Sequence, residues 1–130
     1  MTANEIARAA VAVLIEKKGM AVKLYEVGEE NPLTDFYVNA TGRSMSHVAS
    51  LADDLVDKLA ELGINALRVE GRRGDGWVLV DYGNVIVNVF SGESREFYNL
   101  DRLMPAESIR DITDIINEVD KKYEISNTED

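Results

Sequence analysis

Apolar residues recur every three or four positions in two stretches of the chain, and this spacing predicts two amphipathic helices. The first helix should begin at Thr2, which has the capping-box spacing with Glu5, and should end at Gly19. The second should begin at a serine cap, Ser44 or Ser46, and end before Gly63. The apolar stripes are Ile6, Ala9, Ala10, Val13 and Leu14 in the first helix, and Val48, Leu51, Leu55, Leu59 and Leu62 in the second.

Alternating and β-branched apolar residues predict strands between and after these helices. Two strand-like segments, 22–27 and 35–40, are separated by a turn-forming stretch at 28–32. A further strand is expected over 65–70, followed by a loop at 71–76 that is rich in glycine and arginine. Because helix and strand signals alternate along the chain, we expect an α/β fold with a sheet flanked by helices.

Residues 77–90 predict a β-hairpin whose two faces differ in character. If Gly83 and Asn84 form a two-residue turn, one face of the hairpin is wholly apolar and should belong to the core. That core face comprises Val78, Val80, Tyr82, Val85, Val87 and Val89. The opposite face mixes large apolar groups with polar ones, namely Trp77, Leu79, Asp81, Ile86, Asn88 and Phe90. This mixed face should be covered by a helix or offered to a partner.

The C-terminal part of the chain predicts an accessory helix. After a short helical turn at 93–98, Pro105 is placed to open a helix with the apolar stripe Ile109, Ile112, Ile116, Val119 and Tyr123. Residues 105–130 hold eight acidic and three basic residues, and so carry half of the net charge of −10. We therefore expect a main domain over 1–104 and a C-terminal amphipathic helix with an acidic tail over 105–130. The stripe should pack on its own chain or across a homodimer.

The composition excludes several classes of function. The chain has no cysteine, which excludes disulfides, thiolate catalysis and cysteine-ligated metals. Its 24 acidic and 14 basic residues oppose wrapping by nucleic acid, so a basic protein is a more natural partner than DNA. The apolar stretches are too short or too interrupted to cross a bilayer. We expect a soluble, cytoplasmic protein with no membrane partner.

Candidate catalytic residues are few, and each has a structural alternative. Gly42 and Ser44, between a strand and a helix, could hold a phosphate as in a nucleotidyltransferase. Such an enzyme needs a pair of carboxylates on one following strand to bind magnesium, with a third nearby, but the next strand offers only Glu70 and the hairpin only Asp81. His47 is the only histidine and is more typical of a helix cap or surface position. We therefore expect no enzyme activity, no metal and no cofactor.

The loop at 71–76 has the glycines of a phosphate-binding loop but lacks its Lys-Ser/Thr pair, and it connects two strands without opening a helix. It is more typical of an inter-strand connection. Its two arginines, Arg72 and Arg73, could still contact RNA phosphate or an acidic partner.

Three segments resemble, in order, the ribosomal silencing factor (Iojap) family. Residues 77–103, WVLVDYGNVIVNVFSGESREFYNLDRL, resemble its signature closely. Residues 33–59, LTDFYVNATGRSMSHVASLADDLVDKL, and the step Val69-Glu70-Gly71 are also similar, so the resemblance covers roughly residues 4–104. It implies a mixed sheet related to nucleotidyltransferases but without their catalytic carboxylates.

The resemblance also implies a function. A member of this family would bind the large ribosomal subunit through a basic ribosomal protein, protein fourteen of that subunit, block subunit joining sterically and repress translation when nutrients are scarce. This chain departs from the family in having Asn88 in place of histidine, Asn84 in place of an acid, and Leu-Asp-Arg-Leu-Met at 100–104 in place of Leu-Glu-Arg-Leu-Trp. These departures leave the fold assignment intact and concern the individual residues that would contact the partner.

We expect the partner contact on the mixed face of the hairpin together with Tyr98. The candidate residues are Trp77, Leu79, Asp81, Ile86, Asn88, Phe90 and Tyr98. Two alternatives come from other functional classes. One is a nucleotide-binding or nucleotidyltransferase enzyme that uses Gly42 and Ser44, and the other is an adaptor that dimerises and recruits another partner.

Overall fold

The computed structural model describes residues 1–71 and 75–128, with side chains as far as residue 122. It contains one mixed sheet of six strands in the order β3-β4-β5-β2-β1-β6, in which only β2 and β5 run parallel. The strands are β1 (Met20–Glu26), β2 (Phe36–Gly42), β3 (Arg68–Glu70), β4 (Trp77–Asp81), β5 (Val85–Ser91) and β6 (Ile109–Arg110). The helices are α1 (Ala3–Glu16), α2 (Met45–Glu61), α3 (Gly92–Tyr98) and α4 (Thr113–Thr128), with 3-10 turns at Leu100–Leu103 and Ala106–Ser108.

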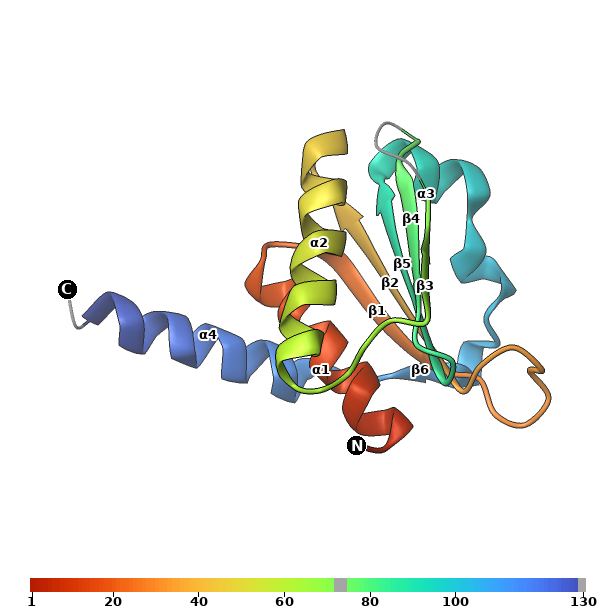
Figure 1. Ribbon diagram of the computed structural model, residues 1–130, viewed down its shortest axis with the longest axis horizontal. Helices are drawn as coiled ribbons and strands as arrows, with labels where there is room; N and C mark the ends of the chain where they lie inside the picture. The colour runs from red at the N-terminus through yellow and green to blue at the C-terminus, as the bar shows by residue number, and fades with distance from the viewer. Residues whose placement is uncertain (72–74, 129–130) are drawn as a thin grey trace.

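The helices lie on both faces of the sheet. Helices α1 and α2 pack on one face, and the short α3 with its following turn packs on the other (Figure 1). The α/β architecture with a mixed sheet flanked by helices is therefore confirmed. None of the helices in the described part of the chain is long and apolar enough to cross a membrane.

The ends of α1 follow the expected signals with one difference. The capping box is present, because the Thr2 side chain accepts from the Glu5 N–H and Glu5 accepts from the Thr2 N–H. At the C-terminus the left-handed residue is Lys18, with φ of 70°, and not Gly19. The Gly19 N–H donates to the Leu14 carbonyl at 2.7 Å, and a Cβ on Gly19 would lie 2.8 Å from that oxygen. Glycine is needed there for close approach.

Helix α2 is capped by Ser44, whose side chain accepts from the His47 N–H at 3.1 Å, so Ser46 is not the cap. Gly63 adopts the expected left-handed conformation, with φ of 83°. The predicted stripe is buried except for Leu62, which is 57% exposed. The prediction for Leu62 was wrong because this residue is already the C-cap, where the chain leaves the helix and no longer follows its face.

The hairpin has the predicted register. Val78 pairs with Val89 and Val80 with Val87. The Tyr82 N–H donates to the Val85 carbonyl at 2.9 Å, which closes the turn. All six residues of the predicted core face are buried.

The prediction that Pro105 opens a long helix was wrong. After the turn at Ala106–Ser108 the chain forms β6, in which Arg110 pairs with Leu24 and Ile109 with Tyr25 of β1. Helix α4 begins only at Thr113, whose N–H donates to the Asp111 carboxylate at 2.9 Å. Two isoleucines three residues apart fit an extended segment followed by a helix start as well as they fit one helical turn, so their spacing could not distinguish the two.

The apolar stripe of α4 changes accordingly. Ile115 is buried and forms its centre, with Ile112 and Val119 partly buried against the core, whereas Ile109 and Ile116 are exposed. The stripe packs on α1 of the same chain, and an ion pair between Arg8 of α1 and Asp114 joins the two helices. Beyond this contact α4 extends away from the sheet (Figure 1).

Candidate partner-binding face

A ladder of aromatic rings crosses the sheet face opposite α1 and α2. The Trp77 ring stacks on Phe90 of the neighbouring strand, with centroids 5.3 Å apart and planes at 28°. It also contacts Tyr98 of α3, with centroids 4.8 Å apart and planes at 46°. Tyr98 in turn meets Phe97 edge-on at 5.0 Å. The ladder therefore runs from the buried Phe90 to Phe97, which is 80% exposed.

The mixed face of the hairpin is divided between cover and exposure. Ile86, Asn88 and Phe90 of β5 are buried, and α3 packs against this strand. Trp77, Leu79 and Asp81 of β4 are only half-buried. The β5 half of this face is therefore buried, whereas the β4 half remains partly exposed.

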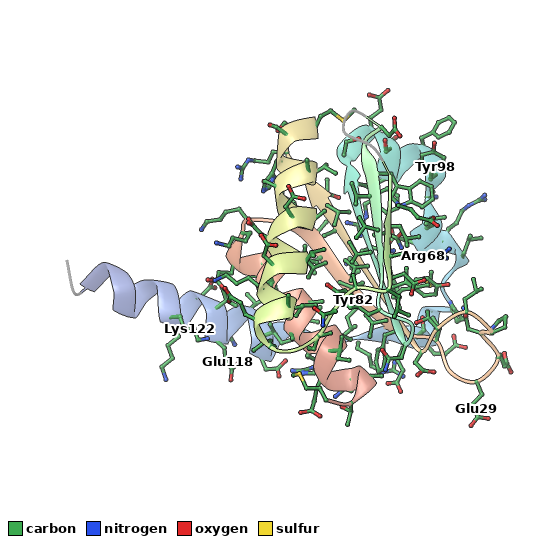
Figure 2. All side chains as sticks on the ribbon, viewed as in Figure 1. Glu29, Arg68, Tyr82, Tyr98, Glu118 and Lys122 are labelled. Atoms are coloured by element: carbon green, nitrogen blue, oxygen red, sulfur yellow. The ribbon has the colours of Figure 1, made fainter. Side chains whose placement is uncertain are left out.

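The open part forms a groove of about 360 Å³. Among the described residues, Trp77, Leu79 and Tyr98 form its apolar walls, Glu70 and Asp75 lie at its polar edge, and Gly71 also lines it. We call the three rings Trp77, Phe97 and Tyr98, together with Leu79 beside them in the groove, the aromatic face. Figure 2 shows Tyr98 and Arg68 on the side of the sheet away from α2, whereas Tyr82 lies between sheet and helices.

Asp81 is engaged within the chain. One carboxylate oxygen accepts from Arg68 Nε at 3.0 Å, and the other accepts from the Gly83 N–H at 2.7 Å. Arg68 also pairs with Glu70, at 3.0 Å. Asp81 therefore stabilises the hairpin turn and the edge strand β3, and a partner cation would have to displace Arg68 in order to reach it.

A chain of buried amides connects the aromatic face to the middle of the sheet. Trp77 Nε1 donates to Asn88 Oδ1 at 3.0 Å, and Asn88 Nδ2 donates to Asn39 Oδ1 at 3.0 Å. Asn39 Nδ2 then donates to Asp101 Oδ1 at 3.1 Å. The two asparagines lie side by side because β2 and β5 pair in parallel with Asn39 opposite Asn88.

Asp101, in the turn after α3, is the acceptor on which these bonds converge. Arg95 Nε and Nη2 donate to its two oxygens at 3.0 and 3.2 Å, and the Tyr25 hydroxyl donates at 2.8 Å. Burial alone would raise the pKa of Asp101, but the hydrogen bonds from Arg95, Asn39 and Tyr25 outweigh it and lower the pKa. Burial, with a smaller contribution from Asp101, raises the pKa of Tyr25 to about 12.

The residues considered for catalysis have structural roles. Gly42 lets the end of β2 pack on α2, because a Cβ there would lie 2.8 Å from the Val48 N and Cγ2 atoms. His47 Nδ1 accepts from the Arg43 N–H at 2.9 Å, and its Nε2 donates to the Lys17 carbonyl at 3.0 Å. The Ser44 hydroxyl is engaged as the cap of α2.

No metal site is evident in the described part of the chain. Glu70 and Asp81 both pair with Arg68, and residues 1–71 and 75–122 contain no group of three histidine or acidic side chains disposed around a common centre. The arginines proposed for contact with phosphate, Arg72 and Arg73, lie outside the described residues.

The sequence model described as "Ribosomal silencing factor during starvation" matches this chain over residues 1–130. The chain belongs to the ribosomal silencing factor family. A ribosomal silencing factor of Halalkalibacterium halodurans is 33% identical over 103 residues, which cover 79% of this chain and 88% of that protein. A crystal structure of a Chromobacterium violaceum protein is 32% identical and superimposes with a TM-score of 0.77 over 80% of this chain and 87% of that one.

The name of a more distant relative mentions the mitochondrion and the large ribosomal subunit. The mouse protein "Mitochondrial assembly of ribosomal large subunit protein 1" is 27% identical over 104 residues, covering 78% of this chain and 46% of the mouse protein. The ribosomal silencing factor match extends through residues 105–130, beyond the range of the resemblance noted in the sequence. Membership assigns the chain a role in ribosome-associated repression of translation, which is a regulatory and not a catalytic role.

The sequence did not single out three residues that shape this site. Phe97, the most exposed ring of the ladder, was identifiable only as the neighbour of Tyr98. Arg95 and Asp101 lie in the segment that resembles the family signature, but no periodicity distinguishes them, because their partners on β1 and β2 are distant in sequence.

Proposed function

We propose that this chain represses translation by binding the large ribosomal subunit through the basic large-subunit protein fourteen and by sterically blocking subunit joining in the cytoplasm. Membership of the ribosomal silencing factor family, over the whole chain, supports a ribosomal target. The name of the mouse relative, which mentions the large subunit, supports the choice of subunit. Inhibition of this kind requires a tight, correctly oriented contact and no chemical step.

The observation that carries the proposed contact is the aromatic face. Single exposed apolar residues are common on protein surfaces, but a contiguous set of rings next to a groove is typical of an interface. Trp77 and Tyr98 belong to the residue types that most often dominate binding energy. Phe97 and Tyr98 are 80% and 45% exposed, so both rings are available to a partner without rearrangement.

The charges around the groove favour a basic partner. The groove has aromatic walls and the carboxylates of Glu70 and Asp75 at its edge. A lysine or arginine side chain would find there the carboxylate of Asp75 and a ring face for a cation–π contact, whereas Glu70 is already paired with Arg68. The net charge of −10 would also speed the approach of a basic protein, so binding should weaken as salt is added.

The candidate contact residues divide into two groups in this proposal. Trp77, Leu79 and Tyr98 would touch the partner directly, with Phe97 added. Asp81 would contribute only if the partner displaced Arg68. Ile86, Asn88 and Phe90 are buried and would support the contacting rings from beneath.

Co-sedimentation with purified large subunits, followed by a subunit-joining assay, tests the proposal. Phe97→Ala should weaken binding about tenfold, the equivalent of about 1.4 kcal/mol, because truncation of an aromatic anchor removes a central contact. Leu33→Ala is the matched control, since Leu33 is 69% exposed and lies in the loop between β1 and β2. Neither change should affect folding.

The possible outcomes distinguish a wrong function from a wrong contact surface. If the parent protein does not sediment with large subunits or fails to inhibit subunit joining, the proposed function is wrong. If the parent binds and folded Trp77→Ala and Phe97→Ala variants bind equally well, the function stands and the contact lies elsewhere on the surface.

A further inference from the structure

Helix α3 and the turn at Leu100–Leu103 are held on the sheet in an unusual way. Every residue of these two segments is described, and none is buried. A helix of seven residues has little stability of its own, and one without a buried apolar stripe cannot be anchored by the core. Yet this segment carries Phe97 and Tyr98, two of the four residues of the aromatic face.

Apart from the contact of the Tyr98 ring with Trp77, the attachment is polar and comes from two side chains. Arg95 of α3 donates to the Ala21 carbonyl of β1 at 2.7 Å and to Thr41 Oγ1 of β2 at 3.0 Å. Asp101 of the turn accepts from Tyr25 of β1 and from Asn39 of β2. Arg95 and Asp101 also bind each other, with side chains only 13% and 25% exposed. Their ion pair closes the loop on which Phe97 and Tyr98 lie.

Asp101 also determines which way the buried amides point. An ionised carboxylate only accepts hydrogen bonds and an indole N–H only donates, whereas each asparagine can do both. With Asp101 at one end and Trp77 at the other, Asn39 must turn its NH₂ group toward Asp101, and Asn88 must turn its own toward Asn39. Asn88 Oδ1 is then left facing Trp77, where it accepts from the ring. The lowered pKa of Asp101 keeps this acceptor ionised at neutral pH.

We propose that Arg95 and Asp101 are positioning residues for the partner-binding face, which hold Tyr98 and Phe97 from one side and orient Trp77 through Asn39 and Asn88 from the other. This inference rests on the proposed function. Neither residue needs to touch the partner. If loss of the ion pair reduced the ordered arrangement to about one tenth of the molecules, the apparent affinity for large subunits would fall about tenfold.

The single tryptophan makes the positioning measurable without any partner, because all indole fluorescence comes from Trp77. Asp101→Asn keeps the size of the side chain and removes the charge and one acceptor. We expect the acrylamide quenching constant of Trp77 to rise about twofold in the folded variant, because the ring is released from Asn88 and Tyr98 part of the time. Binding to large subunits should weaken about tenfold.

Glu26→Gln is the matched control. Like Asp101→Asn, this substitution removes a carboxylate that binds an arginine, because Glu26 Oε1 accepts from Arg110 Nε at 3.2 Å. The Glu26–Arg110 pair, like the Asp101 contacts, joins a C-terminal segment to β1. It has no bond to the amide chain or the aromatic rings. Trp77 quenching and subunit binding should therefore equal those of the parent, even if both variants lose some stability.

The proposal fails if folded Asp101→Asn protein keeps the parent's Trp77 quenching, or if the quenching changes while subunit binding does not. It also fails if Glu26→Gln reproduces both effects, since they would then follow from stability alone. Should Asp101→Asn not fold, Arg95→Lys replaces it with the same readouts, because lysine keeps the charge but not the fork that joins Asp101, Ala21 and Thr41. Absence of binding by the parent would instead refute the proposed function, and the quenching result would still decide whether Asp101 orients Trp77.

Discussion

Two buried tyrosines differ in their hydrogen bonding, so replacing each by phenylalanine should change the free energy of unfolding in opposite directions. Tyr25 and Tyr82 are similarly buried, 6% and 8% exposed. The Tyr25 hydroxyl donates to Asp101 Oδ1 at 2.8 Å. The Tyr82 hydroxyl is buried and has no partner among the described residues. Phenylalanine keeps the ring in both positions and removes only the hydroxyl.

The magnitudes follow from these environments. A hydrogen bond to a charged group contributes roughly 1.5–3 kcal/mol, so Tyr25→Phe should destabilise the protein by about 2 kcal/mol. Burial of an unpaired hydroxyl costs roughly 1–3 kcal/mol in proteins, so Tyr82→Phe should stabilise it by about 1 kcal/mol. The two variants should therefore differ by about 3 kcal/mol, which corresponds to a factor of more than a hundred in the unfolding equilibrium.

Urea unfolding at neutral pH, followed by far-ultraviolet circular dichroism, measures both changes. Burial raises the pKa of each hydroxyl to about 12, so both tyrosines are protonated under these conditions. The urea midpoint should fall for Tyr25→Phe and rise for Tyr82→Phe, with unchanged m-values because the exposed surface is the same. If Tyr82→Phe destabilises the protein as much as Tyr25→Phe does, ring packing and not hydrogen bonding controls both sites, and the reasoning is refuted.

Four other changes are expected to alter stability, each measurable by urea unfolding. Ile115→Ala should cost about 2–5 kcal/mol, since this residue is 5% exposed in the contact of α4 with α1; a cost below about 0.5 kcal/mol would show that the contact is dispensable. Gly42→Ala should cost about 2 kcal/mol, because its Cβ would lie 2.8 Å from Val48 atoms; an unchanged midpoint would contradict this. Ala21→Gly should stabilise by about 1 kcal/mol, as Ala21 is exposed with φ of 48°, and any loss of stability would argue against backbone strain at Ala21. Asp101→Asn should reduce the loss of unfolding free energy at acid pH. In the parent the folded pKa of Asp101 lies below 3.8, so the stabilisation by this carboxylate is present above pH 3.8 and is lost as the pH falls through the lower folded value. A variant whose unfolding free energy falls with acid pH as the parent's does would exclude this role.

Local patterns in the sequence determined much of the fold. The alternation of apolar and polar residues, with Gly83 at the turn, sufficed for the hairpin register and its core face, because side chains of a strand alternate between faces whatever surrounds it. The Thr2 capping box and the left-handed Gly63 were predictable for the same reason, since the groups that interact lie within a few residues of each other.

The C-terminal segment shows where local spacing fails. Ile109 and Ile112 have helical spacing, yet Ile109 lies in β6 because its backbone pairs with Tyr25, more than eighty positions earlier in the chain. A short strand of this kind has no stability of its own and forms only where another edge is open to it. No pattern within residues 105–112 could reveal that edge.

The candidate site depends even more on distant contacts. The sequence placed Trp77, Leu79 and Asp81 on one face with Ile86, Asn88 and Phe90, but only the folded chain decided that the second set is buried and the first is left partly open. Likewise, Asn39 and Asn88 become neighbours only through the parallel pairing of β2 with β5, 49 positions apart in sequence. The periodicity of a strand specifies which face a side chain occupies, whereas its partner on that face is specified by how distant segments pack together.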